Sequence, residues 1–237
     1  MAYAFRSAST TTPASGLGLA INKPAGGVDG DLAVVVGYTE AASWASGGSG
    51  FNSSAALEIQ NTAGASVFWL KLWWKILSGD PASWTFTPSG SAWRSLTAAL
   101  YSGALGTGLG RVDTQSSAQA DGVLQSNQNA PSVTTTANGD LVVFAYGNFS
   151  GDISGSASGF ATGWRADSGG CAIADAIKTT PGATGTTTIG GGSVGTEDYA
   201  ALHVAFLLDS GSAGETGQDR ASLSLKRRRW PIQQRIG

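Results

Sequence analysis

The sequence predicts an all-β protein, a two-layer jelly-roll or β-sandwich built from two related halves with an extended C-terminal arm. Three observations predict it. The apolar segments are short and are bounded by Gly, Pro, Asn or Asp, as strands usually are. Glycine is abundant, with 35 of 237 residues, and only 13% of residues are charged, which disfavours long helices. The hydrophobic share of 41% disfavours disorder.

Nine segments are expected to form strands. Two of them lie in the runs Leu32–Tyr38 and Leu141–Tyr146, which have no polar residue on either face and therefore indicate central strands buried on both faces. The expected strands are Ala33–Tyr38, Ala55–Ile59, Val67–Leu77, Trp84–Phe86, Ser95–Tyr101, Leu141–Tyr146, Ala172–Lys178, Thr186–Ile189 and Ala200–Leu208.

The segment Phe68–Ile76 alternates most clearly, because its odd and even positions form two different faces. The all-apolar face is predicted to lie in the core. The other face is formed by Trp69, Lys71, Trp73 and Lys75. Aromatic rings with flanking lysines can stack on sugars or on a partner subunit. Glycan contact, a subunit interface, and burial beneath a loop or the second half are the alternatives for this face.

The chain also contains an internal repeat. Gly30-Asp31-Leu32 aligns with Gly139-Asp140-Leu141, Lys75 aligns with Lys178, and Ala98-Ala99-Leu100 aligns with Ala200-Ala201-Leu202. The three matches occur in the same order and at similar separations. Two similar halves that cannot each bury a sheet face alone are expected to pack on each other. In this alignment His203 is the counterpart of Tyr101. A position that holds histidine in one half and tyrosine in the other favours a structural role for the histidine.

Composition divides the chain into three regions: a β-sandwich domain over 1–208, a flexible linker over 209–220 and a basic anchoring arm over 221–237. Residues 1–214 carry 8 Lys+Arg and 14 Asp+Glu, whereas residues 215–237 carry 6 and 2. The single cysteine, Cys171, rules out an internal disulfide and is predicted to be a buried thiol.

The arm combines consecutive cations with an apolar anchor, a pairing typical of interface hot spots. We expect it to dock into an acidic groove of a neighbouring protein; a solubilising tail and contact with DNA are the alternatives. Its candidate partner-binding residues are Lys226, Arg227, Arg228, Arg229, Trp230, Pro231, Ile232 and Arg235.

Patterns associated with catalysis or metal binding are few. Gly191–Gly195 fits G-x-S-x-G but lacks the strand–turn–helix context of a nucleophile elbow. Gly103–Gly110 resembles a phosphate loop without its lysine. His203 is the only histidine, and the four glutamates do not cluster as in glycosidases. Calcium binding by Asp29 and Asp31 is an alternative to turn capping. No catalytic residue, metal or cofactor is therefore predicted.

Several short motifs resemble structural proteins of tailed bacteriophages. Pro24–Leu32 resembles their Pro-x-Gly turn followed by Gly-Asp-Leu and an apolar strand, with Trp73-Trp74-Lys75, Gly79-Asp80-Pro81 and Gly163-Trp164 as accompanying matches. Together they span 24–208. The first half departs from the pattern, because Trp44 follows Ser43 and not a glycine. The resemblance implies a head-decoration or minor tail protein with a lectin-like jelly-roll sandwich.

The expected function is therefore that of a non-enzymatic virion protein, which decorates or joins the head or tail through its C-terminal arm. The alternative is a receptor- or glycan-binding tail-tip module. Expected partners are other virion proteins, further copies of the chain and, in the alternative, a host surface glycan. A membrane is not an expected partner, because no stretch approaches 18 apolar residues. Nucleic acid is not expected either, because an apolar anchor directly follows the cations of the arm. The expected location is the virion, assembled in the host cytoplasm.

Overall fold

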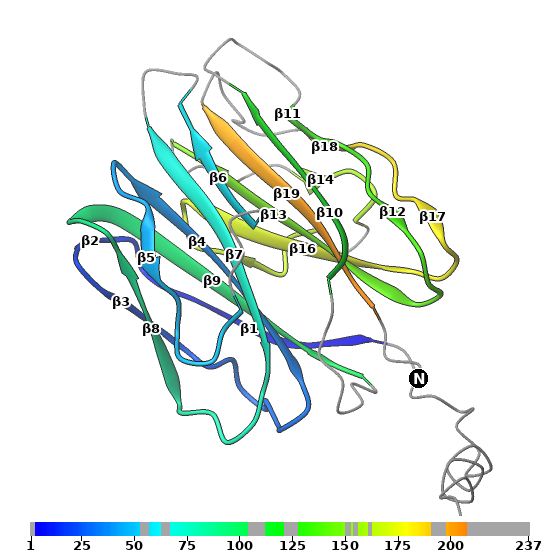
Figure 1. The fold of residues 1–237 in the computed structure, drawn as a ribbon, viewed down its shortest axis with the longest axis horizontal. Coiled ribbons are helices and arrows are strands. Elements are labelled where there is room, and N and C mark those ends of the chain that lie inside the picture. The colour runs from blue at the N-terminus through cyan, green and yellow to red at the C-terminus, as the bar shows by residue number, and fades with distance from the viewer. Residues whose placement is uncertain are drawn as a thin grey trace, which may run out of the picture.

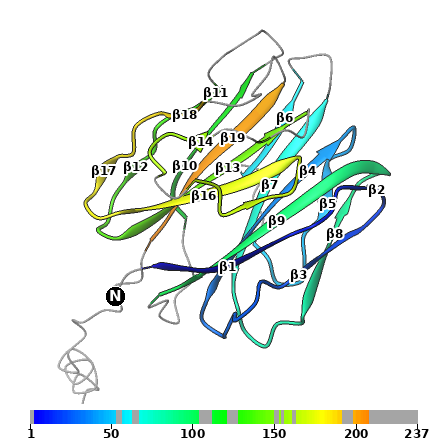
Figure 2. The same cartoon turned by 180° about the vertical axis from the view of Figure 1, so that it is seen from behind.

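The computed structural model describes residues 3–52, 57–62, 67–103, 112–120, 128–149, 153, 156–160, 163–190 and 198–207. Every element in this part of the chain is a β-strand (Figures 1 and 2). The predicted all-β sandwich is therefore confirmed, and each of the nine expected strands has a counterpart. The predicted linker and arm lie outside the described residues.

Two large antiparallel sheets form the centre of the molecule, with the strand orders β1-β9-β4-β7-β6 and β10-β19-β13-β16-β15. The first contains β1 (Ala4–Thr10), β9 (Ala92–Ser102), β4 (Leu32–Glu40), β7 (Phe68–Ile76) and β6 (Glu58–Asn61), and β2 (Ala14–Gly16) also pairs with β9. The second contains β10 (Val112–Ala120), β19 (Tyr199–Phe206), β13 (Asp140–Asn148), β16 (Cys171–Lys178) and β15 (Ala166–Asp167).

Smaller sheets accompany each large sheet. The first half has β3 (Leu19–Asn22), β8 (Ser83–Pro88) and β5 (Trp44–Ser46), in the order β3-β8-β5. The second half has β11 (Gln128–Ala130), β18 (Thr187–Gly190) and β14 (Ser156–Ala157), in the order β11-β18-β14, and a short pair of β12 (Thr134–Thr135) with β17 (Gly182–Ala183). In Figure 1 these strands lie to the outside of the large sheets.

Three apolar clusters hold these layers together. The inner cluster joins the two large sheets and includes Leu70 from β7 and Leu202 from β19. One outer cluster packs Trp73 against the small sheet of the first half, and the other packs Phe144 beneath the small sheets of the second half. The predicted two-layer stack is thus the inner pair of sheets, and each half adds an outer layer of its own. Strands β4 and β13 are buried on both faces, as their sequences predict.

The two halves have the same strand order, which agrees with the predicted repeat. The matched strands are β1 with β10, β9 with β19, β4 with β13, β7 with β16, β6 with β15, β3 with β11, β8 with β18 and β5 with β14.

The Gly-Asp-Leu motif forms the same corner in both halves. Gly30 and Gly139 adopt φ values of 91° and 83°, which glycine tolerates better than other residues. Asp31 accepts a hydrogen bond from the backbone N–H of Val28 (2.9 Å), and Asp140 accepts one from the N–H of Ala137 (3.3 Å). These aspartates therefore fix the turn that leads into each central strand.

The strand ladders correct the alignment of the halves. Leu32 lies opposite Tyr101, and its counterpart Leu141 lies opposite Phe206, so Tyr101 corresponds to Phe206. By the same registers His203 corresponds to Ala98 and not to Tyr101. A second correction follows from the loop contacts: Gly30 donates to the carbonyl of Leu77 and Gly139 to that of Lys178 (2.9 Å each). Lys178 therefore corresponds to Leu77 and not to Lys75.

A polar group also joins the halves beside the inner cluster. Asp175 accepts hydrogen bonds from Arg165 Nε and Nη2 (2.6 and 3.0 Å) and from the Tyr101 hydroxyl (3.3 Å). The Arg165 guanidinium lies 4.4 Å from the ring centre of Phe5. Burial, and next the charge of Asp175, raise the pKa of Tyr101, so its hydroxyl remains a neutral donor.

The inner cluster should control stability. Replacing Leu70, which is fully buried, by alanine should lower the free energy of unfolding by about 2–5 kcal/mol, because the cavity lies between two packed sheets. The same change at Leu17, which is 64% exposed, should alter it by less than about 0.5 kcal/mol. Urea denaturation of both variants measures the difference, and equal losses would contradict the assignment of the inner core.

Candidate functional site

The alternating face of β7 is not an open surface. Trp73 is fully buried and packs edge-to-face on Trp44, with ring centres 5.1 Å apart, and against Phe86 at 4.7 Å. Lys71 is buried and forms a 2.8 Å ion pair with Glu58. Trp69 is partly buried against the same outer cluster. Of the three alternatives for the face of Trp69, Lys71, Trp73 and Lys75, burial holds for Trp73 and Lys71. The cover differs from the expected one, because strands of the same half supply it and not the second half.

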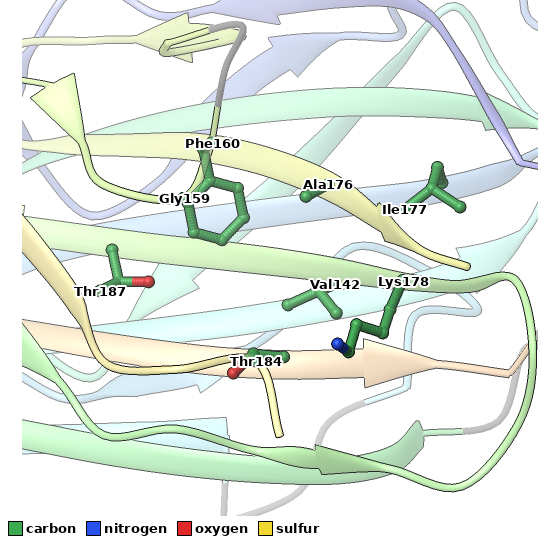
Figure 3. Close-up of a pocket in the computed structure, with 8 residues that line it drawn as sticks. All are labelled: Val142, Gly159, Phe160, Ala176, Ile177, Lys178, Thr184 and Thr187. Carbon is green, nitrogen blue, oxygen red and sulfur yellow. The ribbon is translucent and has the colours of Figure 1, made fainter. Parts of the chain in front are cut away.

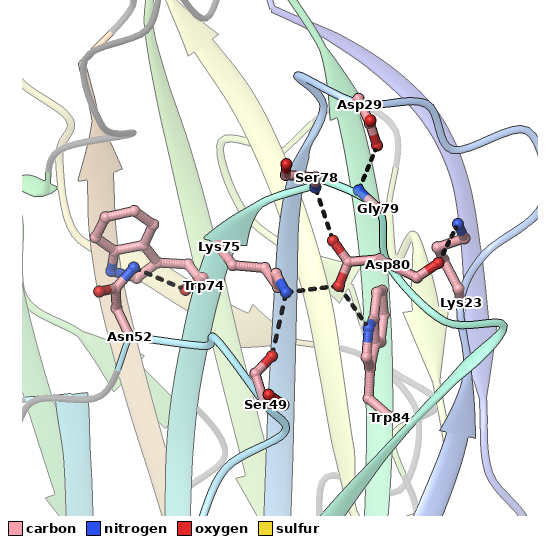
Figure 4. A network of polar contacts seen from close by, with 10 residues as sticks. All are labelled: Lys23, Asp29, Ser49, Asn52, Trp74, Lys75, Ser78, Gly79, Asp80 and Trp84. Atoms are coloured by element: carbon pink, nitrogen blue, oxygen red, sulfur yellow. Dashed lines mark hydrogen bonds and ion pairs between the residues drawn. The ribbon is translucent and has the colours of Figure 1, made fainter.

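Lys75 belongs to a polar network that closes the end of this face (Figure 4). Its amine contacts the Asp80 carboxylate at 2.5 Å and the carbonyl of Ser49 at 3.1 Å. Asp80 also accepts hydrogen bonds from the N–H of Ser78 (2.8 Å) and from Trp84 Nε1 (3.1 Å). The Gly79-Asp80-Pro81 turn is thus a structural corner.

Two opposing effects act on the Asp80 carboxyl. Burial favours the protonated form, but the hydrogen bonds from Lys75, Ser78 and Trp84 outweigh burial and lower the pKa of Asp80. Because the folded pKa lies below that of the unfolded chain, the stabilisation is complete above the unfolded value, roughly 3.9. It is lost as the pH falls through the folded pKa.

Asp80→Asn should therefore lower the free energy of unfolding by about 1–3 kcal/mol at neutral pH, since it removes hydrogen bonds to a charged group. The deficit should shrink as the pH falls below the unfolded aspartate pKa. Chemical denaturation across a pH series measures it. Asp29→Asn is the matched control, because it makes the same substitution at an exposed carboxylate of the same corner. Asp29 accepts a hydrogen bond from the N–H of Gly79 (2.9 Å). A deficit that stays constant with pH would refute the role of the Asp80 charge.

The histidine and the cysteine are both committed to structural contacts. His203 is fully buried, with Nδ1 2.7 Å from the carbonyl of Pro131 and Nε2 2.8 Å from the Thr187 hydroxyl. A carbonyl can only accept, so Nδ1 carries the proton and Nε2 accepts from Thr187. Cys171 is buried, as predicted, among Ser95, Ser168 and Thr97. Burial raises the pKa of the Cys171 thiol, which keeps it protonated and unreactive.

Burial lowers the pKa of His203. As the pH falls through the ordinary histidine range near 6.5, the unfolded chain binds a proton that the folded chain excludes, so stability decreases. His203→Gln cannot titrate. Its deficit relative to the native chain should therefore be largest near pH 8 and smaller near pH 5, as followed by denaturant titration. A deficit that grows on acidification would mean that His203 is charged in the fold.

The remaining candidates have structural roles or lie outside the described residues. Asp31 forms a 2.8 Å ion pair with Arg6. Because the charge of this carboxylate is already paired with an arginine, the contact disfavours calcium binding by Asp31. No cluster of potential metal ligands occurs among the described residues. Residues 191–195, residues 104–110 of the glycine-rich segment and all eight partner-binding residues of the arm lie outside the described part of the chain.

A pocket of about 150 Å³ lies on the outer side of the second half (Figure 3). Its apolar wall includes Val142, Phe160 and Ala176, and its polar lining includes Lys178, Thr184 and Thr187. Ile177, also in the lining, is 37% exposed, so the pocket borders solvent. Small-ligand sites likewise combine apolar side chains with a few polar groups that fix the orientation of the ligand.

Sequence reasoning did not find this pocket. Its residues come from β13, β16, β18 and the loops after β14 and β17, so no local motif contains them. The available signal was the repeat: Gly159-Phe160 matches Gly50-Phe51 at the same separation as Gly139 matches Gly30.

Comparisons with other proteins give no relative. No family model matches the chain, and no curated protein or solved structure is significantly similar to it. Among the described residues, no helix of sufficient length and hydrophobicity to cross a membrane is present.

Proposed function

We propose that this chain is a non-enzymatic structural protein of a tailed-phage particle, which decorates or joins the head or tail through its C-terminal arm. One observation carries the proposal: in the described region, the side chains considered as candidates for catalysis or metal binding make internal structural contacts. His203 and Cys171 are buried and bonded internally, and Asp31 and Asp80 are paired with cations. The motifs that resemble phage structural proteins, Gly-Asp-Leu and Gly-Asp-Pro, form corners that brace the sheets.

The arm supplies the attachment in this proposal. Seventeen residues alone cannot offset a backbone entropy cost of roughly 1–2 kcal/mol each. Against a partner, Trp230 and Ile232 can bury apolar surface worth about 25 cal/mol per Å². Pro231 limits the freedom lost on docking, because its ring fixes φ. The four cations Lys226–Arg229 then add steering and register that weaken as salt rises.

Deletion of residues 221–237 should leave the sandwich folded but abolish incorporation into particles. Trp230→Ala should cause most of this loss at every salt concentration, because the contribution of apolar burial does not depend on screening. The double change Arg227→Ala and Arg228→Ala should reduce incorporation most at low salt. Quantitative electrophoresis of purified particles measures occupancy, and the thermal transition of each variant serves as the folding control. Full occupancy of the truncated chain would overturn the anchoring role.

A second candidate function, a receptor- or glycan-binding tail-tip module, is favoured by the pocket of the second half. The pocket, and not the face of β7, offers a concave apolar site with polar groups at its edge. Copy number distinguishes the two functions: many copies on a particle favour decoration, and a few at the tail tip favour adhesion.

A further inference from the structure

The pocket of the second half corresponds to a position that the first half fills with its own side chains. The turn that carries Phe160 is repeated at Phe51: each phenylalanine N–H donates to the carbonyl three residues earlier, at 3.3 Å and 3.1 Å. The preceding glycines, Gly159 and Gly50, adopt φ values of 82° and 75°. Phe160 and Phe51 therefore occupy equivalent places in the two halves.

The strand registers identify the other equivalent residues. Val142 lies opposite Ala176, and its counterpart Ala33 lies opposite Lys75. In the small sheets, Thr187 lies opposite Ala130 and Trp84 lies opposite Ile21. Ala130 and Ile21 precede Leu141 and Leu32 by the same number of residues. Ala176 thus replaces Lys75, and Thr187 replaces Trp84.

In the first half these two larger side chains occupy the space over the phenylalanine. Trp84 packs edge-to-face on Phe51, with ring centres 5.1 Å apart, and the Lys75 amine lies 5.4 Å from the centre of the Phe51 ring. Asp80 pairs with Lys75 at 2.5 Å and accepts from Trp84. The first half therefore contains, at this position, an aromatic ring together with a paired cation and carboxylate.

The second half has the same apolar wall but a different arrangement of charged groups. Phe160 is stacked on Phe144, with ring centres 5.7 Å apart. Ala176 and Thr187 leave space at the positions that are equivalent to Lys75 and Trp84 of the first half. Lys178 stands at the position of the buried Leu77, and in Figure 3 its side chain extends past Val142 toward Thr184. Within the described part of the chain the Lys178 amine has no carboxylate partner.

From this comparison we propose that the pocket binds a six-membered ring that carries a carboxylate, namely an acidic sugar residue. A cavity of about 150 Å³ has room for a six-membered ring, since an engineered cavity of that size binds benzene. The substituents of the ring can extend to the solvent side, where Ile177 is exposed. The apolar side of a sugar ring fits Phe160 and Val142, and its carboxylate pairs with Lys178. Its hydroxyls can donate to the oxygens of Thr184 and Thr187, whose own protons are directed to the carbonyl of Gly185 and to Nε2 of His203. The inference rests on the comparison of the two halves and does not depend on the structural role proposed above.

The test is a titration of the full chain with glucuronate, glucose and benzoate, followed by isotope-edited NMR and calorimetry. Glucuronate should bind saturably and shift the amide signals of residues around Phe160 and Lys178. Glucose, which lacks the carboxylate, should bind at least tenfold more weakly. Equal binding of glucose would overturn the role of the charge, and binding of benzoate alone would overturn the sugar assignment. No saturable binding of glucuronate would overturn the site.

Three variants locate the binding. Lys178→Gln should weaken glucuronate binding at least tenfold, whereas Lys23→Gln, a matched loss of one cation in the first half, should leave it unchanged. The double variant Ala176→Lys with Thr187→Trp rebuilds the filled arrangement of the first half and should abolish binding. If that variant does not fold, Lys178→Gln and the signal mapping decide the matter. Native affinity in Lys178→Gln would place the ligand elsewhere and overturn the proposal. Particle incorporation is not part of this readout, so its outcome is separate from that of the structural role.

Discussion

The face-to-face packing of the two large sheets is the constraint on which the rest of the structure depends. Strands β4 and β13 lie at the centre of their sheets and are buried on both faces, so each needs apolar partners on two sides. The other half supplies one side and the small sheets of the same half supply the other. Removal of either half would expose a whole sheet face to water, which explains why the halves form one body.

The two halves share one architecture but differ in the side chains of their outer sides. The inner faces must match each other, and they keep comparable apolar residues at equivalent positions, such as Leu32 and Leu141. The outer faces have no such constraint beyond their own small sheets. The first half closes this region with Trp84, Lys75 and Asp80, while the second half leaves a pocket beside Phe160. A difference in chemistry is therefore to be expected on the outside of the molecule.

Most of the strands that the sequence predicts have a strong apolar signal. β4 and β13 are continuous apolar runs, and β7 alternates. β1 and β10 form edges of the large sheets and have no long apolar run: β1 interrupts its apolar residues with Arg, Ser and Thr, and Ser, Thr and Gln dominate β10. The Ala-Ala-Leu match misled the alignment because small apolar residues recur along β19, whereas the ladder fixes the register independently of residue type. Alternation identified the two faces of β7 but could not show that a small sheet covers the second one.

The position of Cys171 gives the molecule an internal reporter of its own opening. The thiol belongs to β16 and contacts the carbonyl of Val36 in β4, at 3.4 Å, across the boundary between the halves. A thiol-alkylating reagent can reach it only when the structure around it opens, because the side chain has no exposed surface. The labelling rate, divided by that of a free thiol, then gives the fraction of time that this boundary is open around Cys171. A single native atom thus makes opening at the boundary between the halves measurable without an introduced probe.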